Sequence, residues 1–433
     1  MRSSSSCTEA AVDLTAPRGT LDLLPPDGGR MHALYERAAR VAELYGFRYV
    51  ETPVFEHTEL FARTSGASSD IVRKEMYSFK DRGDRDLTLR PEGTAPLMRA
   101  YLERVHDLGS PFKGYYLEHM YRYARPQAGR YREHRQFGVE VFGSTAPAAD
   151  VEVITVGDRF LRSLGLRRFE LQVNSIGDGA CRPAYREELI AYFRARVEEL
   201  RDEHRERFEE NPLRVLDCKD EACRTVSAGA PRITERLCDP CREHFDGVLA
   251  GLNVAGVDAV VTPTLVRGLD YYTRTAFEFV SEALSQVQAT LFGGGRYDGL
   301  AEILGGPPTP GIGFGMGLER VLLAITDEGL TPPEDRPLDC YVVIVGEEAA
   351  AHAAHVVDVL REQGLSTDRS FEVRSLKAQM RAADRTNARY AVIIGDRESR
   401  AGTVTWRRLS DGAESSGGVE DAVVEMLTTA DAP

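Results

Sequence analysis

The chain has 433 residues, 42% hydrophobic and 28% charged, which is the balance of a soluble globular protein with two or three domains. No apolar run approaches the ~20 residues that a membrane span needs, and seven cysteines are too few for a disulfide scaffold, so we expect a reduced, cytoplasmic protein with no membrane contact. The net charge of −14 argues against a protein coated in nucleic acid, although local clusters of Lys and Arg can still bind phosphate.

The first part of the chain is predicted to be a tail followed by helices and strands. Residues 1–16 contain four consecutive serines and no apolar core, so we expect a disordered tail rather than a secretory signal. Apolar residues recur at helical spacing over 30–47, and residues 49–53 are predicted to be a strand that ends at a proline. Residues 112–142 have the pattern of two strands around a polar, arginine-rich loop at 125–133.

The middle of the chain is predicted to contain a helical insertion. A helix at 151–164 and a half-buried strand at 169–173 precede a charged, helical and cysteine-bearing segment at about 180–250. After this segment we expect short strands near 260, at 275–280 and at 288–292, and a glycine-rich strand that leads into a helix over 311–325.

The composition changes at residues 327–337, where Thr-Pro-Pro-Glu-Asp-Arg-Pro is predicted to be a linker. Beyond it strands and helices alternate over ~95 residues, which predicts a small separate α/β domain. Its expected elements are strands at 341–345 and 390–394 and helices at 349–360 and 419–427.

The most informative stretch runs from Tyr121 to Glu140 and begins with five arginines in fifteen positions. A solvated hairpin loop is the plain interpretation of such a stretch. If residues 135–142 form a strand, however, Gln136 and Glu140 lie on one face of it, in line with the arginines. That arrangement suits a site that binds a phosphate at one end and a cationic amine at the other.

Two further segments offer polar groups at a turn. Residues 88–94 carry the carboxylate of Glu92 and the hydroxyl of Thr94. Residues 266–273 place Arg267 before a glycine and two tyrosines, so a charge and aromatic walls can share one pocket. Each of these signals is weak by itself.

Two glycine-rich segments complete the set. The run at 293–295 lets backbone approach a ligand closely, although such a run is more often a loop. Alternating glycines at 311–317 keep one strand face free of side chains, so that a flat ring can lie on it. Arg320, one turn into the following helix, can then point at a phosphate.

Together these five segments resemble the class II aminoacyl-tRNA synthetases, and within them the histidyl enzymes. Residues 47–53, 121–140 and 311–320 are similar to the three class II motifs. Signatures of the histidyl family are matched by Leu-Arg-Pro-Glu-Gly-Thr, Arg-Gly-Leu-Asp-Tyr-Tyr and Gly-Gly-Gly-Arg-Tyr-Asp. The similarity runs in the family's order from about residue 18 to the end of the chain, which is far more specific than one motif.

The resemblance implies an α+β fold: a class II catalytic domain with a mostly antiparallel six-stranded sheet, a helical insertion, and a C-terminal α/β anticodon-binding domain. Class II enzymes dimerise through the first-motif region, so a homodimer is expected. The expected boundaries are a tail at 1–16, a catalytic domain at 17–330 with its insertion at about 180–250, a linker at 331–337 and an anticodon-binding domain at 338–433.

The activity implied is that of a histidine–tRNA ligase, which converts ATP, L-histidine and tRNA(His) to AMP, diphosphate and L-histidyl-tRNA(His) through a histidyl-adenylate. Mg²⁺ bridging the phosphates is implied as well. Arg267 and Arg122 would be the catalytic residues, because charge develops on the α-phosphate during in-line attack. Histidine would be bound by Glu92, Gly93, Thr94, Arg122, Gln136, Glu140, Arg267, Tyr271 and Tyr272, ATP by Arg122, Arg130 and Arg320, and the acceptor end of the tRNA by Arg125, Gln127 and Arg132.

One position departs from the family pattern. The second motif usually has an acidic residue two places after its arginine, and here that place is Ala124. The acid helps to seat the nucleotide, so we expect this chain to bind ATP more weakly than a variant with the acid restored.

Four cysteines fall within 24 residues, as Cys218-x4-Cys223 and Cys238-x2-Cys241. Paired thiolates at this spacing can form one tetrahedral structural zinc site. Four reduced cysteines in an inserted helical region are the alternative, and the nearby His204 and His244 are expected to be surface or core residues rather than ligands.

A second basic cluster lies in the C-terminal domain, where Arg374, Lys377, Arg381 and Arg385 are spaced to share a helix face. A solvated face is the usual explanation, and the resemblance raises the alternative that this face binds the anticodon.

Two readings from other classes compete with a ligase. One is a catalytically inactive regulatory subunit of histidine biosynthesis with a synthetase-like fold, which would lack catalytic residues and the C-terminal domain. The other is a nucleic-acid-binding module, which leaves Glu92, Gln136 and Glu140 unexplained. The ligase is favoured because Arg267 and Arg320 are present and because residues 337–433 have the pattern of a whole C-terminal domain.

Overall fold

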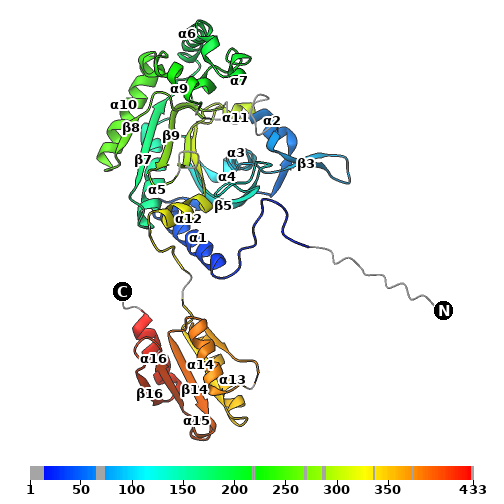
Figure 1. The fold of residues 1–433 in the computed structure, drawn as a ribbon, viewed down its shortest axis with the longest axis vertical. Coiled ribbons are helices and arrows are strands. Elements are labelled where there is room, and N and C mark those ends of the chain that lie inside the picture. Colours follow the sequence, from blue (N-terminus) through cyan, green and yellow to red (C-terminus); the bar gives the residue numbers. More distant parts are fainter. Residues whose placement is uncertain are drawn as a thin grey trace, which may run out of the picture. The chain divides into compact units, whose positions relative to one another are not determined.

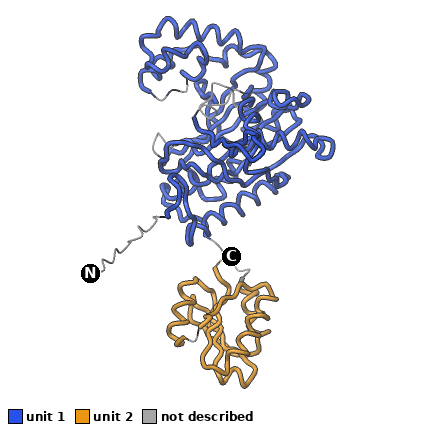
Figure 2. Tube along the Cα trace, turned by 90° about the vertical axis from the view of Figure 1, so that its right-hand side faces the viewer, with its two compact units in different colours: residues 1–334 blue, residues 335–433 orange. Residues whose placement is uncertain are grey.

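The computed structural model describes residues 14–64, 74–216, 218, 220–267, 271–284, 289–334, 337–372 and 374–430. Most of the predicted N-terminal tail therefore lies outside the described residues. The chain divides into two compact units, residues 1–334 and residues 335–433 (Figure 2).

The first unit is built on an eight-stranded sheet (Figure 1). Its six central strands pair antiparallel, whereas the two edge strands pair parallel with their neighbours. The expectation of six strands was wrong by these two edges. Strands at 49–53 and near 260 were predicted, but sequence patterns do not show which strands pair in one sheet. In spatial order the strands are β1 (Arg48–Tyr49), β5 (Phe112–Tyr121), β6 (Glu133–Phe142), β11 (Gly311–Gly317), β10 (Thr290–Arg296), β9 (Thr273–Ser281), β7 (Phe169–Ser175) and β8 (Ala259–Val261).

Alternate residues of these strands point to opposite faces of the sheet. One face, here called the helix face, packs on α5: Phe137 lies 5.3 Å from Phe160 of that helix and 5.6 Å from Phe314, measured between ring centroids. The other face, called the pocket face, carries Gln136 and Glu140. The helices beside this sheet are α1 (Asp27–Leu44), α5 (Pro147–Ser163) and α12 (Leu318–Asp327).

A second, three-stranded antiparallel sheet lies in the N-terminal part of the unit, and sequence patterns did not predict it. Its strands are too short to show a period, and the loop between β2 and β3 includes undescribed residues. The elements of this region are β2 (Phe55–His57), α2 (Thr58–Thr64), β3 (Tyr77–Lys80), β4 (Asp86–Leu89), α3 (Thr94–Glu103), α4 (Val105–Leu108) and α11 (Leu300–Ile303).

The helical insertion separates β7 from β8, which are parallel neighbours in the sheet. Its last helix packs along α5, where His244 faces Asp150 at 3.3 Å. The insertion comprises α6 (Arg182–Arg194), α7 (Asp202–Arg205), α8 (Leu213–Leu216), α9 (Glu221–Ala228) and α10 (Asp239–Val254), with 3₁₀ turns at Val197–Glu199 and Ile233–Glu235.

The second unit has a five-stranded sheet in the order β13-β12-β14-β15-β16, with its own apolar core. The three strands at its start pair parallel and the other two antiparallel, as expected for a small α/β domain. None of the helices in the described part of the chain combines the length and apolar composition that crossing a bilayer requires. The elements are β12 (Cys340–Val345), α13 (Ala349–Glu362), β13 (Thr367–Arg369), α14 (Leu376–Arg385), β14 (Tyr390–Gly395), α15 (Asp396–Ala401), β15 (Val404–Arg408), β16 (Glu414–Gly417) and α16 (Val419–Ala430).

Candidate active site

A polar cavity of about 560 Å³ opens on the pocket face of the large sheet. The loop between β5 and β6, the turn before α3, the segment before β9 and the start of α12 converge on it. Such a convergence of charged groups in a concave site is typical of a ligand-binding pocket. Of the residues expected to bind a ligand, the pocket is lined by Glu92, Thr94, Arg122, Arg130, Gln136, Arg267, Tyr271, Tyr272 and Arg320.

The alternating glycines of β11 make room for side chains of the neighbouring strand. A methyl group on Gly313 would lie 1.5 Å from Oε2 of Glu140, and one on Gly315 would lie 1.5 Å from Nε2 of Gln136. The sequence predicted that these glycines leave one whole strand face free for a flat ring. In the structure, side chains of β6 occupy the space beside Gly313 and Gly315. The glycines let Gln136 and Glu140 lie flat on the pocket face, and only Gly315 and Gly317 line the cavity.

Glu140 is fully buried and does not line the cavity. Thr94 donates a hydrogen bond of 2.6 Å to its carboxylate, and the hydroxyl of Tyr297 donates another. Burial raises the pKa of Glu140 to about 8, despite the two hydroxyl donors, which lower it. Glu140 is therefore connected to the cavity through its hydrogen bond with Thr94, which lines it.

Glu92 and Thr94 lie at the start of α3. The carboxylate of Glu92 accepts hydrogen bonds from the backbone N–H groups of Thr94, at 2.7 Å, and Ala95, at 3.0 Å. Burial raises the pKa of Glu92, opposed by these two N–H groups. Gly93 between them does not line the cavity; a methyl group there would meet the ring of Tyr116 at 2.5 Å, so glycine permits a close approach.

Gln136 has the clearest features of a ligand-binding side chain. Its side chain is 8% exposed and lines the cavity, yet its Oε1 atom has no hydrogen-bond partner among the described residues. A buried acceptor without a partner costs roughly 1–3 kcal/mol. A donor group on a bound molecule would remove this cost.

The other end of the cavity is strongly basic. Arg122 donates to the carbonyl of Pro91 at 2.7 Å, and Arg320 donates to the carbonyls of Gly129, at 3.2 Å, and Thr290, at 2.7 Å. Neither guanidinium forms an ion pair with a carboxylate of the described residues. Burial lowers the pKa of both arginines; for Arg122 the charges of Glu75 and Glu92 oppose this shift, whereas for Arg320 the neighbouring Arg130 and Arg122 add to it. This excess of positive charge favours an anion such as a phosphate.

Arg130 and Arg267 each have a carboxylate partner. Arg130 lies 2.8 Å from Glu75, and Arg267 is hydrogen-bonded to Glu278, which also lines the cavity. The guanidinium of Arg267 lies 5.7 Å from the ring centroid of Tyr272. Gly293 gives it space, because a methyl group at this position would lie 2.5 Å from Nη1 of Arg267.

His134 lines the cavity and was not singled out in the sequence. Burial and the nearby Arg122, Arg320 and Arg130 lower its pKa to about 3, so the imidazole is neutral at physiological pH. A signal for it existed, since residue 134 shares a strand face with residue 136. Glu278 and Glu319, on β9 and α12, were also missed because their roles depend on which strands and helices meet.

Ala124 is buried and lines the cavity near Arg122. A longer acidic side chain at this position would project among the pocket arginines. The structure therefore places the departure from the family motif in the basic end of the cavity.

The three residues expected to contact the tRNA acceptor end lie in the loop between β5 and β6, outside the cavity lining. Arg125 and Gln127 are exposed. Arg132 is partly buried, and its guanidinium lies 3.9 Å from the ring centroid of Tyr123.

Two other arginines in the signature segments are parts of the fold. Arg90 is buried and pairs with Glu118 at 2.8 Å. Arg296 is fully buried on the helix face and pairs with Asp150 and with Asp298. Neither lines the cavity.

The expectation of one zinc site with four cysteines was wrong. The two pairs fall into separate clusters: Cys238 and Cys241 lie with Asp178 and Cys181, whereas Cys218 and Cys223 lie with His204. The spacing of cysteines along a chain does not say which helix ends converge. His204 lies in the second of these clusters, and the expectation that it is not a ligand stays a prediction. His244 is a buried residue hydrogen-bonded to Asp150.

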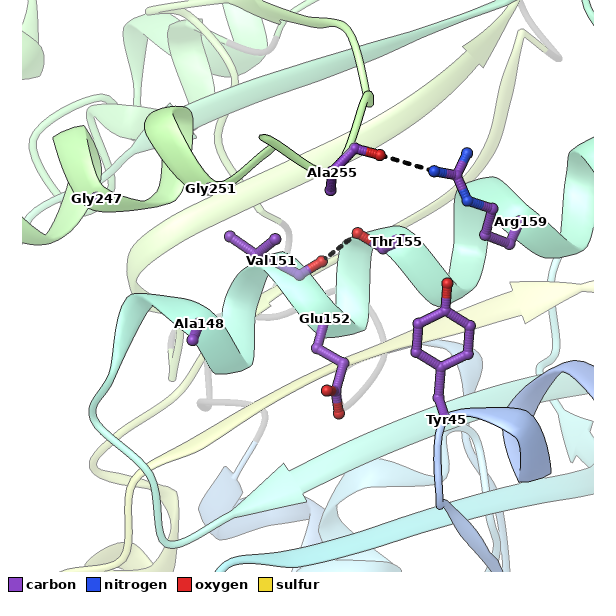
Figure 3. A pocket seen from close by; sticks show the side chains of 9 residues that line it. All are labelled: Tyr45, Ala148, Val151, Glu152, Thr155, Arg159, Gly247, Gly251 and Ala255. Atoms are coloured by element: carbon purple, nitrogen blue, oxygen red, sulfur yellow. Dashed lines mark hydrogen bonds between the residues drawn. The ribbon is translucent and has the colours of Figure 1, made fainter. Parts of the chain in front are cut away.

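A second hollow, of about 490 Å³, lies where α10 crosses α5 (Figure 3). Gly251 permits the close crossing, because a methyl group there would lie 2.6 Å from Val151. Its polar groups are engaged locally: Thr155 donates to Val151 and Arg159 to the carbonyl of Ala255. The hollow lacks a cluster of convergent charges and contains none of the expected site residues.

Comparison with known proteins gives a consistent picture. Residues 19–321 match the family model of histidyl-tRNA synthetase, and residues 339–429 match that of an anticodon binding domain. The chain is 51% identical over 399 residues to the histidine–tRNA ligase of Moorella thermoacetica, covering 92% of this chain and 94% of that one. It is 45% identical over 400 residues to that of Acetivibrio thermocellus, covering 92% and 96%. The crystal structure of apo histidyl-tRNA synthetase from S. aureus matches with a TM-score of 0.79 and 35% identity, over 95% of this chain and 99% of that one.

Proposed function

The chain belongs to the histidyl-tRNA synthetase family and catalyses the ligation of histidine to tRNA, and we propose that the polar cavity is where ATP first activates histidine as an adenylate. The observation that carries this proposal is the division of the cavity. One end has an unpartnered acceptor and a carboxylate, and the other has two arginines, Arg122 and Arg320, that form no ion pair with the described residues.

The acceptor end suits histidine. Oε1 of Gln136 is positioned to accept a hydrogen bond from the ammonium or the imidazole, and Glu92 supplies negative charge for the ammonium. Tyr271 and Tyr272, whose ring centroids are 4.8 Å apart, form an aromatic wall. Glu140 would act through Thr94, with which it shares a hydrogen bond. A pocket built on specific hydrogen bonds strongly rejects amino acids that cannot form them.

The basic end suits the triphosphate. Arg122 would hold the α-phosphate and the attacking carboxylate, Arg320 and Arg130 would hold the distal phosphates, and Arg267 would stabilise the charge that develops at phosphorus. In-line attack needs positioning and charge neutralisation more than a general base. Mg²⁺ would enter bound to ATP as part of the substrate and would add to this neutralisation.

The first test is histidine-dependent exchange of pyrophosphate into ATP, without tRNA and with the other amino acids as controls. We expect exchange with histidine alone. A Gln136→Leu variant should raise the KM for histidine by about 10- to 100-fold, the equivalent of a lost hydrogen bond to a charged group, and leave the KM for ATP nearly unchanged. Equal increases in both KM values would contradict the division of the cavity.

Transfer to tRNA would follow, with contacts in both units. Arg125 and Gln127 are exposed in the loop beside the cavity and are the proposed acceptor-end contacts, with Arg132 holding that loop through Tyr123. In the anticodon-binding unit, α14 exposes Lys377, Arg381 and Arg385 at helical spacing. Phe371, which is 91% exposed, precedes this helix and can stack on a base.

A homodimer is part of the proposal. Large apolar side chains are exposed around β1 and the small sheet, among them Tyr49 at 53%, Phe55 at 51% and Phe79 at 44%. Exposed apolar patches of this kind mark protein contacts. Sedimentation equilibrium should give twice the mass of the chain, and a Tyr49→Asp variant should shift it toward the monomer.

The alternative hypothesis, that the chain is an inactive regulatory subunit of histidine biosynthesis, is not favoured. The relatives that match over 92% of the chain are histidine–tRNA ligases, and the anticodon-binding match is present. Catalysis in the cytoplasm is consistent with the six described cysteines, all of which are free thiols.

A further inference from the structure

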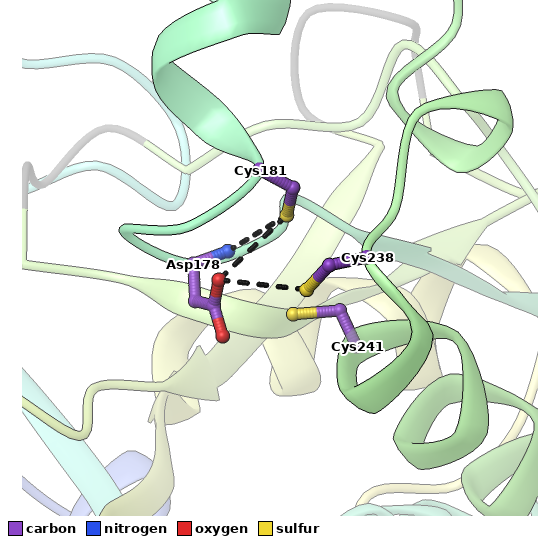
Figure 4. A group of neighbouring side chains, drawn as sticks. All are labelled: Asp178, Cys181, Cys238 and Cys241. Atoms are coloured by element: carbon purple, nitrogen blue, oxygen red, sulfur yellow. Dashed lines mark hydrogen bonds between the residues drawn. The ribbon is translucent and has the colours of Figure 1, made fainter.

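Four potential metal ligands meet at the base of the helical insertion (Figure 4). They are Asp178 and Cys181, which precede or begin α6, and Cys238 and Cys241, which begin α10. Their ligand atoms all lie within 4.8 Å of one another. The side chains point into one space from two separate helix ends.

The two oxygen–sulfur distances in this cluster are close to those of a tetrahedral metal site. With metal–sulfur bonds of about 2.3 Å and metal–oxygen bonds of about 2.0–2.2 Å, neighbouring ligand atoms of a tetrahedron are about 3.5–3.8 Å apart. Oδ1 of Asp178 lies 3.7 Å from Sγ of Cys181 and 3.8 Å from Sγ of Cys238. The fourth ligand atom, Sγ of Cys241, lies within 4.8 Å of each of the other three.

The surroundings favour negative ligands. Cys181 is the N-cap of α6 and Cys238 the N-cap of α10, so the positive ends of two helices face the cluster. Arg274 lies 3.4 Å from Oδ2 of Asp178, the oxygen that the thiols do not share. Three thiolates and a carboxylate around a dication would carry a net negative charge, which these groups partly offset.

We propose that Asp178, Cys181, Cys238 and Cys241 form a structural Zn²⁺ site that fastens the insertion to the catalytic sheet. The Cys-x2-Cys turn at the start of a helix, two additional ligands and complete closure by protein atoms are the features of a structural zinc site. The cluster around His204 offers three ligands in the described residues and is not needed for this proposal.

The site is joined to the histidine pocket by the backbone. The N–H of Arg274 donates to Gly177 at 2.7 Å, and the N–H of Ile176 donates to Arg274 at 2.7 Å. Arg182, the residue after Cys181, donates to the carbonyl of Tyr272 at 2.5 Å. Zinc would therefore stabilise the segment that carries the tyrosine wall, so its removal should raise the KM for histidine several-fold.

The test uses the full-length protein, purified under reducing conditions without chelator from cells supplied with zinc. Elemental analysis should find about one zinc per chain. The protein stripped of metal and reduced should bind Co²⁺ with a thiolate-to-cobalt charge-transfer band, and its thermal midpoint should be below that of the zinc-loaded protein. The KM for histidine, measured with excess Mg²⁺, should fall again when zinc is restored.

Variants locate the ion. Cys238→Ser/Cys241→Ser should lose the zinc and the cobalt band, whereas the matched Cys218→Ser/Cys223→Ser variant and the Cys340→Ser variant should keep both. The cobalt titration of stripped wild-type protein decides the matter if the first variant does not fold. Wild-type protein that binds neither metal, zinc that follows Cys218 and Cys223 instead, or a disulfide between Cys238 and Cys241 in the reduced preparation would each overturn the proposal.

Discussion

Two arginines of the first unit, Arg296 fully buried and Arg320 half-buried, differ in what surrounds them. Arg296, on the helix face, donates to both carboxylate oxygens of Asp150 and to Asp298. Arg320, beside the cavity, donates to backbone carbonyls and forms no ion pair within the described part of the chain. Burial lowers the pKa of both arginines. For Arg296 the charges of Asp150 and Asp298 outweigh burial, so its pKa is raised. For Arg320 the neighbouring arginines lower the pKa further.

This difference distinguishes arginines that stabilise the fold from arginines that are proposed to bind substrate. An arginine whose charge is balanced inside the protein contributes to stability, and its removal leaves a carboxylate stranded. An arginine that is buried without a balancing charge is held at a cost, and an anionic ligand removes that cost. Both kinds lie in the signature segments, so motif membership alone does not distinguish them.

The largest expected effect is on the stability of the helix face. An Arg296→Met variant should lower the free energy of unfolding by about 3–5 kcal/mol, because Asp150 would remain buried without its arginine partner and keep only the contact with His244. Urea unfolding, measured without added histidine ligand, gives this free energy. A double variant that also changes Asp150 to Leu should recover part of the loss, and an unchanged midpoint for Arg296→Met would refute the assignment.

The next effect is on catalysis at the cavity. Arg320→Met should reduce the kcat of pyrophosphate exchange by about 10²- to 10³-fold, the range for loss of one preorganised charge, or about 2.7–4 kcal/mol. Because Arg320 forms no ion pair with any described residue, the unfolding midpoint should stay the same or rise. A large fall in stability with normal kcat would reverse the comparison with Arg296.

A smaller effect should appear in the pH dependence of stability. The folded pKa of Glu140, raised to about 8 by burial, exceeds its unfolded value, so its contribution is fully present below pH ~4.5 and is lost as pH rises through about 8. Relative to a Glu140→Gln variant, the wild type should lose up to about 1.4 kcal/mol per pH unit within this window. Thermal melts of both proteins between pH 5 and pH 9 measure the difference; parallel curves would show that Glu140 is ionised throughout.

The smallest effect is expected at Ala124. An Ala124→Glu variant should lower the KM for ATP by about two- to tenfold, the equivalent of one hydrogen bond of about 0.5–1.5 kcal/mol. The KM for histidine should change little, which serves as the internal control. An ATP KM that stays the same or rises would show that the missing acid does not limit nucleotide binding here.

Much of the site could be anticipated because its residues come from short local patterns. The period of two in β6 correctly placed Gln136 and Glu140 on one face. It could not say that Glu140 lies behind Thr94 and Tyr297, because depth depends on α3 and β10, which are distant in the chain. His134 obeys the same period and was overlooked.

Features that depend on distant segments were beyond local patterns. Cys181 and Asp178 lie far in sequence from Cys238 and Cys241, and only the folded insertion brings the ends of α6 and α10 together. The edge strands β1 and β8 have two and three residues, so they exist because a longer neighbour pairs with them. The predicted strands at 49–53 and near 260 overlap them, but local patterns do not show that they pair at the edges of this sheet.

The glycines of β11 have a consequence for how this sequence can evolve. Space above Gly315 is filled by the amide of Gln136, so even alanine at 315 collides with the residue proposed to read the substrate. The two positions are therefore expected to covary among descendants of this chain. A side chain at 315 would either displace the amide of Gln136 or require a shorter residue at 136, and both changes would alter the contact proposed to bind histidine.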